Sequence, residues 1–102
     1  MKLKDIITLK EVANDLNEGK DFYDQREVGV GNYFWDSLVA DIESLIIYAC
    51  IHNKRYGLHR MLAMRFPYAI YYEIKNEIAY VVAVLPLRRD PLWIKKKLQK
   101  RS

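Results

Sequence analysis

Residues 65–87 read RFPYAIYYEIKNEIAYVVAVLPL, and this stretch decides the fold. The alternating side chains of residues 68–74 are typical of a β-strand, and Pro67 before them marks a tight corner. A polar turn at 75–77 leads into residues 78–85, which are apolar on both faces of a strand. A strand of that kind is usually covered on both sides. The stretch therefore predicts an antiparallel pair whose second strand lies inside the sheet.

Further strands are expected on either side of this pair in the sequence. After Gly57, Leu62, Met64 and Phe66 recur at period two, which predicts a strand leading up to the Pro67 corner. Residues 3–7 are expected to form a short strand at the N-terminus.

Two helices are expected between the N-terminal strand and the meander. Thr8 and Glu11 have the spacing of a capping box, which predicts a helix that starts at Thr8. Gly29 and Gly31 mark a chain reversal, and apolar residues then recur at helical spacing over 32–52. The pattern predicts a helical hairpin with a wide apolar face.

The C-terminal segment carries the signals of a helix start. Asp90 is a favoured N-cap residue and Pro91 is favoured at the first helical position. The expected class is α+β: an N-terminal strand and an α-helical hairpin packed on a small antiparallel β-sheet, in the order β-α-α-β-β-β with a short C-terminal helix. A chain of 102 residues suits one core, so residues 1–102 are predicted to form one domain.

Composition limits the cellular setting. The longest apolar runs are about half of the ~20 residues that a membrane-spanning helix needs, so no membrane contact is expected. The N-terminus lacks the apolar core and cleavage site of a secretory signal, which favours the cytoplasm. Cys50 is the single cysteine and lies in an apolar run. It is expected to be a buried, inert thiol.

Charge is distributed unevenly along the chain. Residues 1–53 carry five Lys/Arg and ten Asp/Glu, whereas residues 54–102 carry twelve Lys/Arg and three Asp/Glu. A basic half of this kind attracts nucleic acid or an acidic protein partner.

Two motifs carry a family resemblance. Residues 65–72 read RFPYAIYY and residues 84–91 read VLPLRRDP. Together with the order of elements, they resemble the RelE/ParE toxin superfamily, and particularly its ParE-like branch of plasmid stabilisation proteins. The resemblance implies the toxin of a bacterial type II toxin–antitoxin system, which inhibits growth and is neutralised in a hetero-oligomer with a cognate antitoxin. Members either cleave messenger RNA on the ribosome without a metal or block DNA gyrase.

The residues themselves favour the second activity. Metal-free RNA cleavage needs a general base, a general acid and cations around the phosphate. Ala69 and Pro86 stand where relatives that cleave RNA typically carry an arginine and a histidine, and residues 89–95 hold neither Tyr nor His. The sequence thus favours stoichiometric inhibition of gyrase. Two alternatives stay open, a ribosome-dependent mRNA endonuclease and a decayed, non-toxic module that only binds an antitoxin.

Candidate site residues follow from these hypotheses. The arginines beside the corner and at the end of the last strand are expected to converge on one ligand. The predicted target-binding residues are Arg60, Arg65, Arg88, Arg89, Trp93, Lys95 and Lys96. No catalytic residue is assigned unless the protein is a ribonuclease, in which case the candidates are His59, Arg60, Arg65 and Arg88.

Some of these residues also have a structural interpretation. Arg88 and Arg89 can equally brace the junction around Asp90, and His59 is more often structural at a strand start. The aromatic residues Tyr71, Tyr72 and Tyr80 are expected in the core rather than stacked on bases.

The predicted antitoxin-binding residues lie on the helical hairpin. Tyr23, Trp35 and Val39 are expected to line a groove for an acidic amphipathic segment, unless they close the core of the protein itself. No cofactor is expected, because no phosphate-binding glycine loop occurs. No metal site is expected either, because His52 and His59 do not suffice for zinc.

Overall fold

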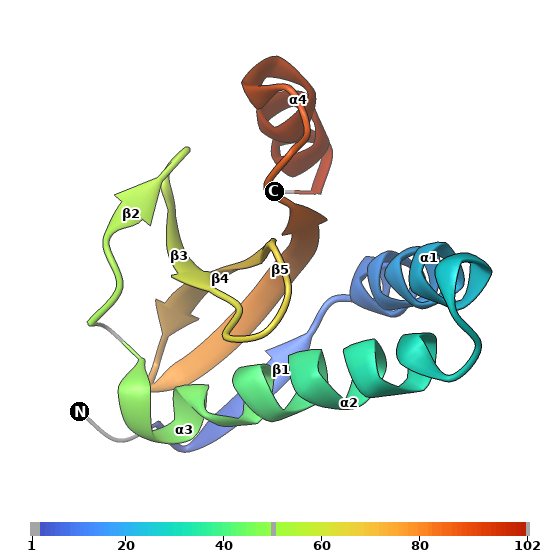
Figure 1. Cartoon of the computed structure of the whole chain (residues 1–102). Helices are drawn as coiled ribbons and strands as arrows, with labels where there is room; N and C mark the ends of the chain where they lie inside the picture. Colours follow the sequence, from blue (N-terminus) through green and yellow to red (C-terminus); the bar gives the residue numbers. More distant parts are fainter. Residues whose placement is uncertain (1–2, 50, 102) are drawn as a thin grey trace.

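The computed structural model describes residues 3–49 and 51–101, and it places one mixed β-sheet between two layers of helices (Figure 1). The helices α1 and α2 cover one face of the sheet and α4 covers the other. The elements in chain order are β1 (Asp5–Thr8), α1 (Glu11–Arg26), α2 (Val30–Glu43), α3 (Leu45–Tyr48), β2 (Lys54–Arg55), β3 (Leu58–Leu62), β4 (Tyr68–Lys75), β5 (Ile78–Pro86) and α4 (Pro91–Arg101).

The sheet has five strands in the order β1-β5-β4-β3-β2. The pairs β5–β4 and β4–β3 are antiparallel, as expected, and so is β3–β2, but β1 runs parallel to β5. The sheet is therefore mixed rather than antiparallel throughout, because the chain returns to the side of β1 only after the helices and the meander. Strand β2 was not predicted, because its two residues are too few to show the alternation of apolar and polar side chains that marks a strand.

Strand β5 is covered on both faces, as its sequence predicts. Val81 and Val84 face the helical hairpin in one apolar cluster. Val82 and Leu85 face α4 in a second cluster, which includes Ile94. The uninterrupted apolar run of residues 78–85 thus reflects two separate cores that share one strand.

Glycines allow the two helices of the hairpin to pack closely and the chain to reverse between them. A Cβ atom built on Gly19 would overlap the ring of Phe34, so only glycine lets α1 and α2 pack at this distance. At the reversal, Gly29 has a φ of 95°, a conformation that favours glycine. The Gly31 backbone N–H then donates to the Asp24 carboxylate at 2.7 Å and starts α2.

The start of the first helix corrects the capping-box prediction. Helix α1 begins at Glu11 rather than Thr8, and no side chain caps it. Thr8 is paired with Val81 in the parallel ladder, and the Leu9 backbone N–H donates to the Val81 carbonyl at 2.9 Å. Because residues 8–9 complete the sheet, Thr8 cannot act as the N-cap.

The second helix and the third strand are shorter than predicted. Helix α2 ends at Glu43 and α3 ends at Tyr48, after which Ala49 is extended. Strand β3 ends at Leu62, because the buried carboxylate of Asp41 accepts a hydrogen bond from the Met64 backbone N–H at 3.1 Å. That contact bends residues 63–67 into a corner. The expectation for Cys50 lies outside the described residues.

Helix α4 begins as predicted and is anchored at its far end. The Leu92 backbone N–H donates to the Asp90 carboxylate at 2.8 Å, which caps the first turn. At the other end, the Arg101 guanidinium contacts both carboxylate oxygens of Asp15, at 2.6 and 2.8 Å. The same carboxylate accepts the Val84 backbone N–H at 3.0 Å, and Arg101 also donates to the Val82 carbonyl at 3.2 Å.

This ion pair is nearly inaccessible to water. The side chains of Arg101 and Asp15 are 8% and 3% exposed. The hydrogen bonds that Arg101 donates to the Asp15 carboxylate raise the pKa of Arg101, and burial opposes that rise. One contact therefore joins α1, β5 and α4.

We predict that Arg101→Met lowers the free energy of unfolding by about 3 kcal/mol, because it leaves the Asp15 carboxylate buried without its partner. Urea denaturation followed by tryptophan fluorescence measures the effect. The matched control is Lys100→Met on the exposed side of α4, for which we expect a change within about 0.5 kcal/mol. Equal changes in the two variants would contradict the structural role of the pair.

Candidate protein interface at the end of β5

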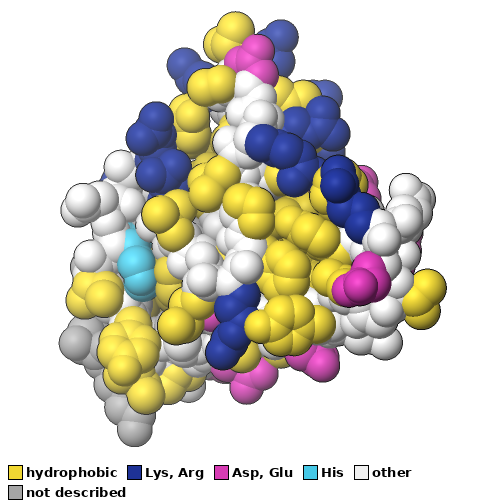
Figure 2. Space-filling view, viewed as in Figure 1, with side chains coloured by type: hydrophobic (Ala, Val, Ile, Leu, Met, Phe, Trp, Pro, Cys, Tyr) yellow, Lys and Arg dark blue, Asp and Glu magenta, His cyan; other side chains and the backbone are white. Residues whose placement is uncertain are grey.

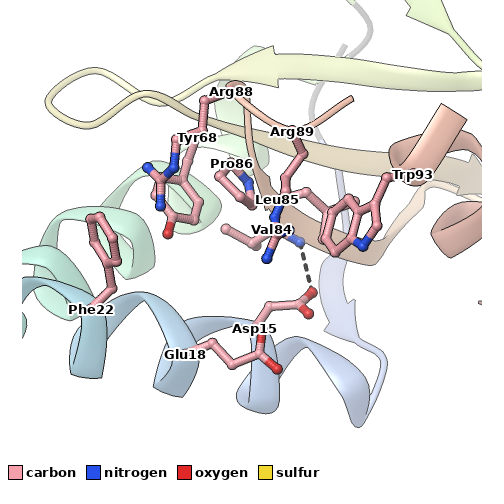
Figure 3. Close-up of a pocket in the computed structure, with 10 residues that line it drawn as sticks. All are labelled: Asp15, Glu18, Phe22, Tyr68, Val84, Leu85, Pro86, Arg88, Arg89 and Trp93. Atoms are coloured by element: carbon pink, nitrogen blue, oxygen red, sulfur yellow. Dashed lines mark hydrogen bonds between the residues drawn. The ribbon is translucent and has the colours of Figure 1, made fainter. Parts of the chain in front are cut away.

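A pocket of about 110 Å³ lies where β5 ends and α4 begins (Figure 3). It combines residues of α1, the first residue of β4, the end of β5 and the start of α4. The lining residues are Asp15, Glu18, Phe22, Tyr68, Val84, Leu85, Pro86, Arg88, Arg89 and Trp93.

Arg88 reaches from the end of β5 across Tyr68 toward α1 (Figure 3). Its guanidinium carbon lies 4.2 Å from the centre of the Phe22 ring, and that of Arg26 lies 4.5 Å from the same ring. A cation over an aromatic face gains about 0.5–1 kcal/mol at an exposed site. These contacts hold the Arg88 side chain in place at the wall of the pocket.

Arg89 occupies the opposite wall beside α4. Its guanidinium carbon lies 4.5 Å from the centre of the Trp93 ring. The Lys97 ammonium lies 5.4 Å from the same ring centre. Trp93 therefore provides a partly exposed aromatic surface between two cations.

The pocket carries charges of both signs. Asp15 is already paired with Arg101, so Glu18 is the remaining carboxylate of the described lining. Burial raises the pKa of Tyr68, Tyr23 raises it further and Arg88 opposes the rise. Tyr68 is therefore a neutral hydrogen-bonding group at physiological pH. The pocket offers two guanidinium groups, aromatic surface and one acid.

The structure divides the predicted target-binding residues among several places. Arg88, Arg89 and Trp93 share the pocket at the end of β5, whereas Arg60 lines a different pocket beside β2. Figure 2 shows Lys and Arg side chains in separate groups with hydrophobic surface between them. The structure therefore brings Arg88 and Arg89 together at the end of β5 and places Arg60 elsewhere.

The other predicted residues lie outside the β5 pocket. Arg65 is in the corner that precedes β4 and lines neither of these two pockets. Lys95 lines a third pocket beside Tyr56, and Lys96 is exposed on α4.

Sequence reasoning missed the contribution of α1 to the pocket. Phe22, Glu18 and Tyr68 lie far from Arg88 in sequence, and only the packing of α1 on β5 brings them together. The spacing of Phe22 and Arg26 could have indicated the contact between these two side chains, since residues four apart on a helix are neighbours.

His52 and His59 both contact the buried Tyr72. His59 contacts the carbonyl of His52 through Nδ1 at 2.9 Å, and its ring stacks on Tyr72 with 5.1 Å between centroids. His52 contacts the Tyr72 hydroxyl through Nδ1 at 2.5 Å. His59 therefore has a structural environment, and His52 is the histidine that lines the pocket beside β2.

Two of the predicted antitoxin-binding residues share a groove. Trp35 and Val39 of α2 line an apolar groove with Val12, Ala13, Leu16 and Ile42. Tyr23 lies elsewhere, in an aromatic cluster in which its ring centre is 5.3 Å from that of Phe34 and 4.8 Å from that of Phe66.

The three aromatic strand residues that were expected in the core differ in burial. Tyr71 and Tyr72 are fully buried, whereas Tyr80 is partly exposed.

Comparison with known proteins shows the fold of this chain. The sequence matches no protein-family model and no curated protein. The structure superimposes on a solved chain of the chromosomal ParDE TA system from P. aeruginosa with a TM-score of 0.75 and 13% sequence identity, over 84% of this chain and 98% of that chain. The protein thus has the α+β fold that the resemblance to the RelE/ParE superfamily implied. Its fold is ParE-like.

None of the helices in residues 3–49 and 51–101 is long and apolar enough to cross a membrane. The same part of the chain contains no group of three or more His, Cys, Asp or Glu residues that could hold a metal ion.

We predict that His52 makes stability sensitive to mildly acidic pH. Burial lowers the pKa of His52 below 6.5, and His59 lowers it further. Between the folded pKa and 6.5 the unfolded chain binds more protons, so the folded state loses stability as the pH falls through this window. His52→Asn should reduce the loss measured by urea denaturation between pH 7.5 and pH 5. The exposed Lys54→Asn serves as the control, and an unchanged pH dependence in His52→Asn would refute the assignment.

Proposed function

We propose that this chain is the toxin of a type II toxin–antitoxin system, which acts in the cytoplasm by binding DNA gyrase stoichiometrically and is neutralised by a cognate antitoxin. The observation that carries the proposal is the fold, which the chain shares over 84% of its length with a chain of a ParDE TA system.

The pocket at the end of β5 supports a protein as the target. Arginine and aromatic residues are enriched among the side chains that dominate protein–protein binding. Here Arg88 lies over Phe22 and Arg89 over Trp93, and these contacts favour one conformation of each side chain before a partner binds. A pre-ordered side chain loses less entropy on binding, which favours affinity.

The same pocket is poorly suited to RNA cleavage. The Glu18 carboxylate would repel a phosphodiester, and Tyr68 stays protonated at physiological pH because burial raises its pKa. Pro86, which pairs with Tyr68 across the strands, has no proton to transfer. These residues supply contacts rather than acid–base catalysis.

A ribonuclease remains the second candidate function because of the pocket beside β2. His52 lines it together with Lys54, Arg55 and Arg60, so a titratable ring lies next to three cations. This constellation could bind and cleave a phosphodiester, whereas the pocket at the end of β5 could not.

We predict that the purified protein inhibits the supercoiling activity of gyrase, and that Arg88→Ala with Arg89→Ala raises the inhibitory concentration about tenfold or more. A supercoiling assay on relaxed plasmid measures this. Lys10→Ala, an exposed charge between β1 and α1, is the control and should leave inhibition unchanged.

Cleavage of ribosome-bound messenger RNA is measured in parallel with wild type, His52→Ala and His59→Ala. Codon-specific cleavage that His52→Ala abolishes, without inhibition of gyrase, would replace the proposal by the second candidate. Activity in neither assay, combined with tight binding to the protein encoded by the adjacent gene, would identify an antitoxin-binding module that is no longer toxic.

The groove between α1 and α2 supports the antitoxin part of the proposal. It is lined mainly by apolar side chains, and Trp35 and Val39 are only partly buried in it. An amphipathic helix inserts its apolar face into a groove of this kind.

We predict that Trp35→Glu weakens binding of the adjacent gene product at least about tenfold, because it places a charge in the apolar groove. Isothermal titration calorimetry measures the affinity. Asn32→Glu adds the same charge at an exposed position of α2 and should bind like wild type. Equal affinities for the two variants would place the antitoxin elsewhere.

A further inference from the structure

The outer edge of the sheet at β2 is largely uncovered. Strand β2 pairs only with Leu58 and His59, although β3 continues to Leu62. Beyond β2, the Arg60 backbone N–H donates to the Asn53 carbonyl at 3.1 Å. Residues 60–62 pair with β4 on their inner side, and no strand of the described chain pairs with them on the outer side. An exposed edge of this kind can pair with an added strand.

The opposite edge of the sheet is different. Strand β1 is flanked by α3, and the Leu3 backbone N–H just before it donates to the Ile46 carbonyl at 3.2 Å. The β2 side is therefore the more accessible of the two edges.

A basic pocket lies beside the uncovered part of β3. Its lining residues are Ile51, His52, Asn53, Lys54, Arg55, Arg60, Met61 and Leu62. This lining includes three cations and no carboxylate. Figure 2 shows Lys and Arg side chains, a histidine and hydrophobic side chains together on the side where Figure 1 draws β2 and β3.

Among the residues that the structure describes, the cations of this pocket have no acidic partner. None of Lys54, Arg55 and Arg60 forms an ion pair with a carboxylate of the described residues. Instead, Arg55 lies over the Tyr56 ring at 5.7 Å, and Arg60 lies beside the Tyr71 hydroxyl. The positive charge at this edge is therefore uncompensated, which favours an anionic partner.

Exposed apolar side chains flank the same pocket. Ile51 is 72% exposed and Leu62 is 53% exposed. A partner that covers both needs apolar groups as well as negative charge. An extended peptide meets these requirements, because its backbone can pair with the strand edge while its side chains reach both faces of the sheet, where Lys54 and Arg55 point to opposite sides.

We propose that the β2 edge, defined as residues 51–55 and 60–62, is a docking site for an extended acidic segment of a partner protein. The segment adds a strand to the outer edge of β3 beyond β2. Its carboxylates lie against Lys54, Arg55 and Arg60, and its apolar side chains cover Ile51 and Leu62. The inference rests on this edge alone and does not require the toxin assignment.

Single-stranded nucleic acid fits the edge less well. The described lining of this pocket contains no Phe, Tyr or Trp on which bases could stack, so His52, Arg55 and Arg60 are the flat side chains that it offers. Nucleic acid also leaves the backbone groups of a strand edge unpaired. The edge therefore favours a peptide over an oligonucleotide.

The test uses the full chain and a fluorescein-labelled ten-residue peptide in which pairs of glutamate alternate with pairs of valine, so that both faces of the strand carry both residue types. Fluorescence anisotropy is the readout. We expect this peptide to bind, and the same peptide with lysine in place of glutamate not to bind. N-methylation of alternate backbone nitrogens should weaken binding about tenfold, since a methylated nitrogen cannot donate to β3.

Protein variants locate the site. Lys54→Glu with Arg55→Glu, both at exposed positions of β2, should weaken binding at least about tenfold. The control, Lys10→Glu with Lys100→Glu, makes the same change in net charge at exposed positions outside the edge and should retain binding. Circular dichroism verifies that both double variants are folded.

Three results would overturn the proposal: no binding of the valine–glutamate peptide, equal binding by the two double variants, or affinity unaffected by N-methylation. The outcome in which a twelve-nucleotide single-stranded RNA binds at this edge and the acidic peptide does not would assign the edge to nucleic acid instead. None of these measurements depends on gyrase inhibition, so this proposal and the proposed function can fail separately.

Discussion

The buried ion pair between Asp15 and Arg101 is the contact on which the arrangement of the layers depends. A buried pair gains little net stability over apolar side chains of similar size, because both charges must first leave water. The effect of this pair is to specify one position of α4 on the sheet. Arg101 reaches both carboxylate oxygens of Asp15 from one position of α4, and Asp15 also holds the backbone of Val84. Apolar contacts of Ile94 and Leu98 alone would leave α4 freer to slide or rotate on the sheet.

The ion pair also determines the character of the pocket at the end of β5. Asp15 is part of the lining, and without Arg101 it would add a second unpaired carboxylate beside Glu18. Fixing α4 places Trp93 next to Arg89. A C-terminal residue thus controls the charge and the shape of a pocket whose arginines lie about a dozen positions earlier in the chain.

Local signals in the sequence were sufficient for much of the fold. The apolar run of β5 predicted a strand covered on both sides, and Asp90 with Pro91 predicted the start of α4, because each pattern depends on neighbours in the chain. The prediction that Thr8 caps the first helix was wrong because the backbone of Thr8 pairs with Val81, about seventy residues away. The Phe22–Arg88 contact is equally nonlocal, so the spacing of Phe22 and Arg26 within α1 could indicate a local contact but not that α1 lines the pocket.

Cations of residues 54–102 line two chemically different places, the pocket at the end of β5 and the β2 edge. At the end of β5 the arginines lie over aromatic rings and beside a carboxylate, so their charge is partly compensated before a partner arrives. At the β2 edge the cations border exposed apolar side chains and a stretch of β3 with which no described strand pairs on the outer side, with no acid in the lining. Electrostatic attraction alone would draw the same anion to both places. The two proposals therefore rest on the groups around each set of cations: the aromatic surface favours a folded protein partner, and the strand edge favours an extended one.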